Sequence, residues 1–82
     1  MNKAYKNYIE SLDTIKLEAE LDRQYASSSD CARPEGMRYR ASLRYRACEL
    51  LLGWKEHDTE SAKRLYLSFW KRYLPLESII IL

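Results

Sequence analysis

Glycine and proline are scarce in this chain, which has only two of each among its 82 residues. Because both residues mark turns, their scarcity disfavours a turn-rich β-sheet fold and favours long helices. A chain of this length supports one domain with a thin core. We therefore expect a single all-α domain over residues 1–82.

The sequence also lacks a long apolar run and a secretory signal. No stretch approaches the roughly 20 apolar residues needed to span a bilayer, and the first residues, MNKAYKNYIESLD, are mixed and charged. The two cysteines, Cys31 and Cys48, form neither a CxxC pair nor a metal-site spacing. These absences predict a cytoplasmic protein with two reduced thiols.

Patterns associated with catalysis are absent too. The one histidine, His57, lies in a charged stretch, and no HExxH, GxxxxGKS, GxGxxG or EF-hand motif occurs. Glu56 and Asp58 beside His57 do not make a general-base site, because adjacency in a loop fixes no geometry. The sequence therefore predicts no enzyme, no catalytic residue, no cofactor and no metal site.

Apolar residues at helical spacing are plentiful in the first half of the chain. One stripe predicts a first helix over about 2–25; its members are Tyr5, Tyr8, Leu12, Ile15 and Ala19. Serines, an aspartate and a proline follow, which predicts a loop over 26–34. The second helix is expected over about 35–55, with Pro34 in or near its first turn.

The third helix is expected over about 59–74. Asp58 or Thr59 is suited to cap its first turn, since short polar side chains accept hydrogen bonds from free backbone amides there. Pro75 is expected to end the helix, because proline lacks a backbone N–H and clashes with the preceding turn. The remaining tail, 75–82, is apolar and is expected to pack on the domain or at a subunit interface.

The middle helix carries an RYR repeat within MRYRASLRYRACELLLGW, residues 37–54. At 100° per residue, the repeat places its two tyrosines on opposite sides of the helix. One apolar stripe holds Tyr39, Leu43, Ala47, Leu50 and Trp54; the other holds Ala41, Tyr45, Cys48 and Leu52. Arg38 and Arg46 lie on one polar strip between them, and Arg40, Arg44 and Lys55 lie on the other. A helix that is apolar on two sides is usually packed between neighbours.

Charge is distributed unevenly along the chain. Residues 1–36 contain five Lys or Arg and seven Asp or Glu, whereas residues 37–75 contain nine and four. The simplest interpretation is that the acidic and basic parts attract each other within the fold. The other interpretation is a basic surface for an external anion.

These patterns favour protein binding as the function. Three helices do not easily cover both stripes of the middle one, so we expect a three-helix bundle that self-associates as a homodimer. It would act as an adaptor, regulator or inhibitor of another protein. The expected contact residues are Arg38, Tyr39, Arg40, Arg44, Tyr45, Arg46, Trp70, Ile79, Ile80, Ile81 and Leu82.

Nucleic-acid binding by the Arg- and Tyr-rich middle helix is the alternative hypothesis. Arginines neutralise phosphates and tyrosines stack on bases, but the tyrosines fall on the predicted core stripes and the pI is only about 8.6. A membrane-surface role is weaker still, because core packing explains the apolar stripe of the last helix.

Overall fold

A computed structural model describes residues 3–81, and it describes side chains for residues 3–73. This part of the chain forms four helices: α1 (Lys3–Glu10), α2 (Thr14–Ser29), α3 (Glu35–His57) and α4 (Glu60–Ile81). The prediction of an all-α fold is confirmed. The prediction of three helices is wrong, because the region expected to form the first helix forms two helices, α1 and α2.

The break between α1 and α2 lies at Ser11–Asp13. The hydroxyl of Ser11 donates to the carbonyl of Tyr8 at 2.6 Å, and the carboxylate of Asp13 accepts from the amide of Lys16 at 2.8 Å. Short polar side chains thus compete with the helix for its backbone groups and start a new one. The break changes which side is buried: Leu17 is fully buried, whereas Ile15 is 80% exposed.

The connection between α2 and α3 is shorter than predicted. Residues 26–29 belong to α2, so only 30–34 remain outside helices, in place of the expected loop 26–34. Asp30 organises this turn, since its carboxylate accepts from the amide of Ala32 and its carbonyl accepts from the amide of Arg33. Pro34 precedes the first residue of α3, as predicted.

Asp58 and Thr59 separate α3 from α4. Asp58 has a left-handed backbone, with φ 48°, and its amide donates to the carbonyl of Trp54 at 2.7 Å. The hydroxyl of Thr59 accepts from the amide of Ala62 at 3.1 Å, which confirms Thr59 as the cap of α4.

The prediction that Pro75 ends the last helix is wrong, because α4 continues to Ile81. A proline removes its own backbone hydrogen bond and costs about 3 kcal/mol within a helix. The backbone hydrogen bonds of neighbouring residues can still continue the helix. Residues 75–81 are therefore helical and do not form the expected tail. The prediction that the apolar side chains of 75–82 pack on the domain or at an interface concerns side chains outside the described residues.

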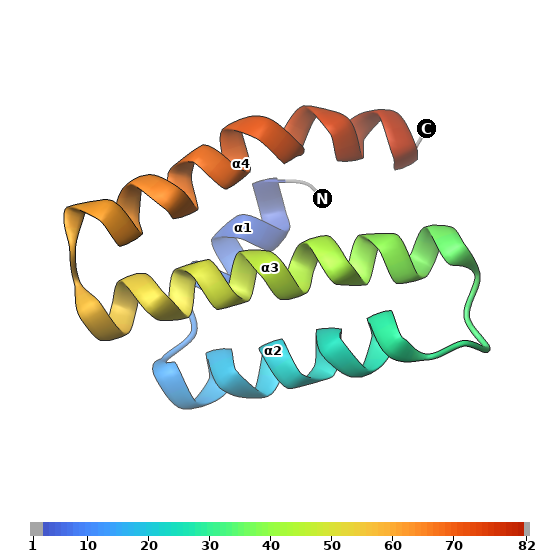
Figure 1. Cartoon of the computed structure of the whole chain (residues 1–82), viewed down its shortest axis with the longest axis horizontal. Helices are drawn as coiled ribbons and strands as arrows, with labels where there is room; N and C mark the ends of the chain where they lie inside the picture. Colours follow the sequence, from blue (N-terminus) through green and yellow to red (C-terminus); the bar gives the residue numbers. More distant parts are fainter. Residues whose placement is uncertain (1–2, 82) are drawn as a thin grey trace.

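The helices pack around α3. Figure 1 shows α3 lying between α2 and α4, with α1 crossing behind this layer. Helix α3 has its main contacts with α2 and α4, so both of its apolar stripes meet helices of the same chain. The core contains residues from all four helices: Ile9, Leu17, Leu43, Ala47, Cys48, Leu51, Tyr66, Phe69 and Trp70. The middle position predicted for this helix is confirmed, but the fold removes the need for a second chain to cover it.

Candidate functional site

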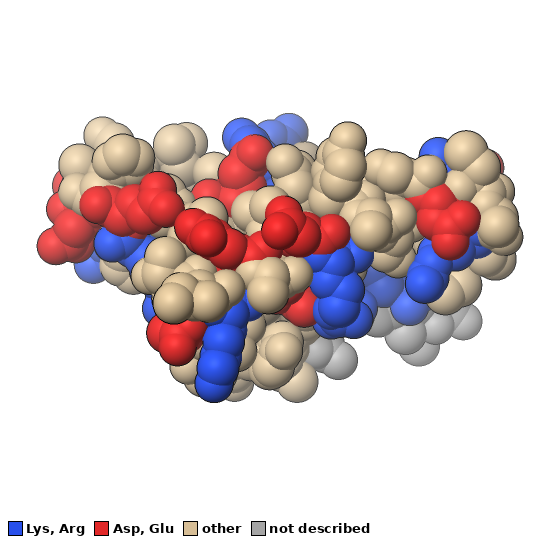
Figure 2. Space-filling view, turned by 90° about the horizontal axis from the view of Figure 1, so that it is seen from below, with Lys and Arg blue, Asp and Glu red and all other residues tan. Residues whose placement is uncertain are grey.

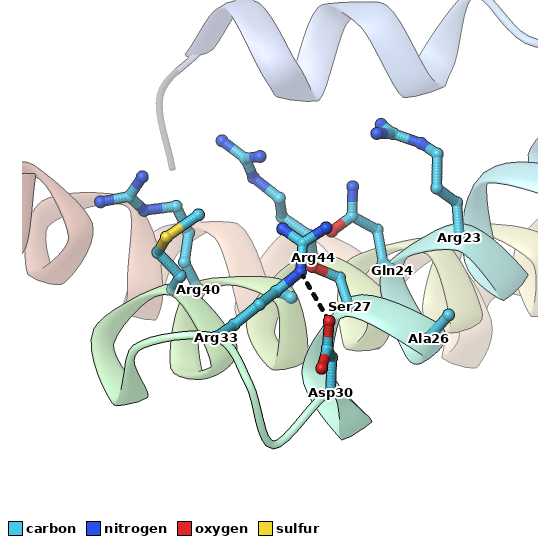
Figure 3. Close-up of a pocket in the computed structure, with 10 residues that line it drawn as sticks. Arg23, Gln24, Ala26, Ser27, Asp30, Arg33, Arg40 and Arg44 are labelled. Carbon is cyan, nitrogen blue, oxygen red and sulfur yellow. Dashed lines mark ion pairs between the residues drawn. The ribbon is translucent and has the colours of Figure 1, made fainter.

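A cationic pocket lies between the second half of α2 and the first half of α3. Its volume is about 370 Å³, and it extends to the 30–34 connection. It is lined by Arg23, Gln24, Ala26, Ser27, Asp30, Arg33, Met37, Arg40, Ala41 and Arg44. Figure 3 shows the arginines reaching toward the pocket from both helices and from the connection. Four arginines and a single carboxylate therefore line one concave surface.

Arg44 forms no ion pair with a carboxylate among the described residues. Its guanidinium carbon lies 4.7 Å from the centre of the Tyr5 ring, an arrangement in which the ring face attracts the cation. Its Nε atom is buried and has no hydrogen-bond partner among the described residues. Burial lowers the pKa of Arg44, and the charge of Arg40 acts in the same direction. Arginine nevertheless stays charged at neutral pH, so the site holds a poorly solvated cation.

Arg23 is held at the pocket by Glu20. Its Nε donates to one carboxylate oxygen at 2.7 Å and its Nη2 to the other at 2.9 Å. A guanidinium has five N–H donors, so this pairing leaves donors on Nη1 for another group. The hydrogen bonds with Glu20 raise the pKa of Arg23. Arg23 is thus fixed in place by an internal carboxylate and retains capacity to bind an anion.

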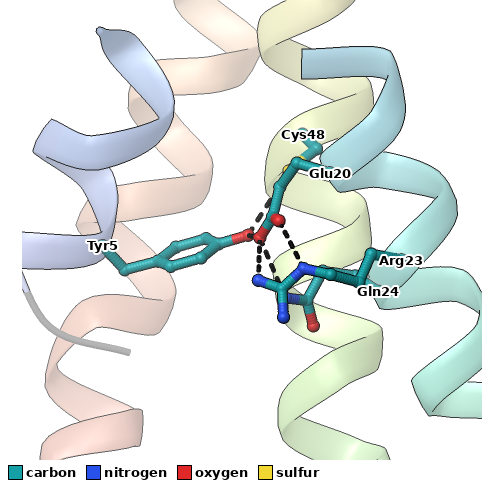
Figure 4. A network of polar contacts seen from close by, with 5 residues as sticks. All are labelled: Tyr5, Glu20, Arg23, Gln24 and Cys48. Atoms are coloured by element: carbon teal, nitrogen blue, oxygen red, sulfur yellow. Dashed lines mark hydrogen bonds and ion pairs between the residues drawn. The ribbon is translucent and has the colours of Figure 1, made fainter. Parts of the chain in front are cut away.

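Glu20 is the centre of a polar network behind the pocket, which Figure 4 shows. It is only 4% exposed and also accepts from Tyr5 at 2.6 Å and from Gln24 at 2.9 Å. Burial acts to raise the pKa of Glu20, but the hydrogen bonds from Arg23, Tyr5 and Gln24 outweigh it and lower that pKa. The Tyr5 hydroxyl also lies 3.5 Å from the sulfur of Cys48. The network joins α1, α2 and α3 beneath the arginines.

Arg33 and Asp30 belong to the connection at the mouth of the pocket. The Nε atom of Arg33 lies 3.4 Å from the Asp30 carboxylate, and both side chains are about half exposed. Asp30 also accepts a backbone hydrogen bond from Ala32. A partly solvated ion pair of this kind contributes little to stability, roughly 0–1 kcal/mol, so Arg33 can turn toward an incoming anion without a large loss.

The surface beside the pocket has the opposite charge. Figure 2 views the molecule from the side of α2 and shows a row of acidic side chains along this face, with most of the visible Lys and Arg side chains on one side of the row. Glu18 and Asp22 are exposed carboxylates of α2. Positive charge therefore does not extend over the whole of this face.

Two of the predicted contact arginines lie together in this pocket. Arg40 and Arg44, from one polar strip of the middle helix, both line it. The two on the other strip lie elsewhere: Arg38 donates through Nε to the carbonyl of Ser28 at 3.2 Å, and Arg46 forms an ion pair with Glu49. The division of arginines between two strips is reflected in two different environments.

The predicted aromatic contacts are distributed differently. Tyr39 is 44% exposed, and Tyr45 is half-buried with its ring centre 5.6 Å from that of Tyr25. Trp70 is 3% exposed and packs against Tyr66 and Phe69 in the core, so it is not available as a contact residue on this surface. The side chains of Ile79, Ile80, Ile81 and Leu82 lie outside the described residues.

Arg23, Gln24 and Arg33 were not predicted as site residues. Their role depends on the antiparallel pairing of α2 with α3, which brings Arg23 to the same cavity as Arg44. The sequence does place a cation near the end of the first helical region, another in the following loop and two more in the next helix. A hairpin model of these segments would have brought the four together.

Other kinds of site find no support in the part of the chain with described coordinates. No group of three or more His, Cys, Asp or Glu side chains there is arranged to hold a metal ion. No helix in that part is long and apolar enough to cross a membrane. Comparisons with protein-family models, with curated proteins and with solved structures find no match. Function must therefore be argued from the chemistry of the pocket.

Proposed function

We propose that this protein is a small helical binding module that recognises an anionic group on a protein partner through the pocket between α2 and α3. The observation that carries this proposal is the lining of the pocket, in which four arginines face one carboxylate. Arginine is suited to this role because its planar group offers paired donors to carboxylates and phosphates. The chain would act as an adaptor, regulator or inhibitor and not as an enzyme.

The proposal is tested by comparing two variants of α3 that each replace a charged arginine with neutral glutamine, Arg44→Gln and Arg46→Gln. Both remove one positive charge from the same helix, but Arg44 lines the pocket and Arg46 pairs with Glu49 away from it. Proteins that crosslink to the full chain in a host extract would be quantified for each form by mass spectrometry. We expect a set of partners that Arg46→Gln retains and Arg44→Gln loses.

Equal capture by both variants would contradict the proposal, because the pocket would then contribute nothing to partner choice. Equal loss in both would also contradict it, since general charge and not the pocket would be responsible. Urea unfolding of the two variants must show that each is folded. If Arg44→Gln fails to fold, it is replaced by Arg33→Gln, whose side chain lies on the connection at the mouth of the pocket.

Nucleic-acid binding is less well supported by the arrangement of charges. A nucleic-acid backbone needs a track of cations along its length, whereas the arginines of α3 are divided between two environments. The exposed carboxylates of Glu18 and Asp22 on α2 would repel a strand that continued past the pocket. Tight binding of the full chain to single-stranded DNA, weakening steeply with salt, would favour this alternative over a protein partner.

Self-association and a cytoplasmic location stay proposals from the sequence. Exposed apolar side chains on α4, with Leu65 60% and Leu67 43% exposed, support a second copy as a partner. Light scattering at high micromolar concentration tests this, and a monomeric mass throughout would refute it. The free thiols of Cys31 and Cys48 support a reducing compartment.

A further inference from the structure

The size of the pocket limits the ligand that it can enclose. Binding pockets for small molecules range over about 300–1,000 Å³, and this pocket, at about 370 Å³, is near the lower end. It can take one compact group with a few atoms attached. The ligand that best fits this volume is therefore a single anionic group and not a long polyanion.

The number of cations that meet in the pocket indicates the charge of that group. Arg23, Arg33 and Arg44 come from α2, the connection and α3, and each is on a different part of the wall. Asp30 offsets one charge and the buried Glu20 behind the wall offsets another. These three arginines outnumber the two carboxylates, so the wall keeps a net positive charge and suits an anionic group.

The available donors indicate the geometry of the group. Arg23 has donors left on Nη1 after its pairing with Glu20, and the guanidinium of Arg44 lies over the Tyr5 ring at 4.7 Å, a contact that uses none of its N–H donors. Among the described residues, Arg33 is held by a long contact of 3.4 Å with Asp30. Donors that approach from three directions suit a tetrahedral group with three free oxygens, whereas a planar carboxylate has two.

Resting on the proposed function, we infer that the group recognised by this pocket is a phosphate monoester. At neutral pH this group carries a charge of about −1.5 to −2 and three strong acceptor oxygens. Arg23, Arg33 and Arg44 would each donate to a different oxygen, and the exposed carboxylates of Glu18 and Asp22 on α2 would disfavour a nucleic acid that continued past the pocket. The same chemistry occurs on phosphorylated side chains and on small phosphorylated metabolites.

The test is a calorimetric titration of the full chain with O-phosphoserine, succinate, sulfate and a 15-nucleotide single-stranded DNA at constant ionic strength. We expect O-phosphoserine to bind at least about tenfold more tightly than succinate, because its phosphate places two charges and three acceptor oxygens on one compact group, whereas succinate divides its two charges between separate carboxylates. Its affinity should rise about fourfold from pH 5.5 to pH 7.5 as the dianion forms with a pKa near 6. Sulfate, which is already a dianion, should show no such rise.

Variants assign the binding to the pocket. Arg44→Gln should weaken O-phosphoserine binding by about tenfold or more, since a charge-assisted hydrogen bond is lost, while Arg46→Gln should bind as the unaltered chain does. A heptapeptide with a central phosphoserine and ribose 5-phosphate identify the source of the group. Tighter binding of the peptide assigns a phosphorylated protein, and tighter binding of the sugar phosphate assigns a metabolite.

The outcomes separate this inference from the proposed function. If succinate binds as tightly as O-phosphoserine and Arg44→Gln weakens both, the pocket recognises anions in general and only the phosphate assignment is overturned. If the DNA binds more tightly than every phosphate monoester, the assignment is overturned in favour of nucleic acid. If no probe binds and partner capture is insensitive to Arg44→Gln, both the inference and the proposed function are rejected.

Discussion

The hydroxyl of Tyr5 on α1 donates a hydrogen bond of 2.6 Å to the carboxylate of Glu20 on α2. The same ring supports the guanidinium of Arg44 from α3 at 4.7 Å. Tyr5 is thus shared by three helices, and it links the short α1 to the wall of the cationic pocket. Because α1 has only eight residues and would be marginal alone, such contacts must hold it in place.

Replacing Tyr5 with phenylalanine tests this attachment. Tyr5→Phe keeps the ring but removes the hydroxyl donor to a charged acceptor, so we expect a loss of about 1.5–3 kcal/mol in the free energy of unfolding. Urea denaturation followed by circular dichroism measures it. Tyr8→Phe on the same helix is the control, because the Tyr8 side chain is 48% exposed. Equal stability of the two variants would show that the Tyr5–Glu20 bond does not secure α1.

The lowered pKa of Glu20 predicts a pH dependence of stability. A carboxyl group whose pKa is lower in the folded state than its ordinary value of 4.5 stabilises the fold above that value. The contribution is lost as the pH falls from about 4.5 through the folded pKa. Glu20→Gln should therefore be less stable than the unaltered chain at pH 7, and the difference should shrink at pH 3.5. Urea unfolding at both values measures the difference.

Glu18→Gln is the matched control for this pH dependence. Glu18 is exposed on the same helix, two residues away, so its replacement should change stability little at either pH. A difference between Glu20→Gln and the unaltered chain that stayed constant from pH 7 to pH 3.5 would contradict the assignment of the titration to Glu20.

Arg44→Met separates the function of this arginine from its contribution to stability. Methionine keeps much of the side-chain volume, and it removes a poorly solvated charge that lacks an Nε partner among the described residues. The loss of the contact with the Tyr5 ring acts in the opposite direction, at roughly 0.5–1 kcal/mol. We expect the free energy of unfolding to stay within about 1 kcal/mol, whereas binding of O-phosphoserine is lost. A loss of stability above about 3 kcal/mol would indicate a structural role instead.

The sequence predicted the parts of the fold that depend on periodicity and local capping. The middle helix with two apolar stripes, Pro34 before it and Thr59 as the cap of α4 are all confirmed. These features depend on residues that are close together in the sequence, so they can be predicted from one sequence.

The errors arose where a local signal was weak or was overridden. The stripe from Tyr5 to Ile15 continues through the break at Ser11–Asp13, so periodicity alone predicted one helix. Asp13 carried the available signal, as an N-cap residue within a predicted helix. The prediction that Pro75 ends the last helix was wrong, since α4 continues past it. At Ser11–Asp13 the backbone followed competing hydrogen bonds that a count of apolar residues does not include.

The sequence predicted two of the four arginines that line the pocket. The spacing of Arg40 and Arg44 placed them on one strip of the middle helix, and both line the cavity. Arg23 and Arg33 contribute because α2 folds back along α3, and this depends on tertiary pairing. Trp70, predicted as a contact residue, lies in the core, because its size and apolar surface suit a core as well as an interface.

The two cysteines should differ sharply in reactivity. Cys31 is exposed on the connection, whereas Cys48 is fully buried. Burial raises the pKa of Cys48 to about 11. At pH 8 only about one thiol in a thousand at this site is then ionised, and the thiolate is the reactive form. Ellman's reagent should label one thiol rapidly in the native protein and the second only in denaturant. Rapid labelling of Cys31→Ser without denaturant would contradict the buried position of Cys48.

The left-handed residue between α3 and α4 provides a test of the turn geometry. Asp58 has φ 48°, a region that is unfavourable for residues with a Cβ atom and open to glycine. Asp58→Gly should raise the free energy of unfolding by roughly 0.5–1 kcal/mol, since the backbone bond to Trp54 is retained. Asp58→Ala is the control and should bring no gain, because alanine adopts this conformation less readily than aspartate. Urea unfolding compares the stability of the three proteins. If Asp58→Ala were more stable than Asp58→Gly, the backbone at residue 58 would not be left-handed in solution.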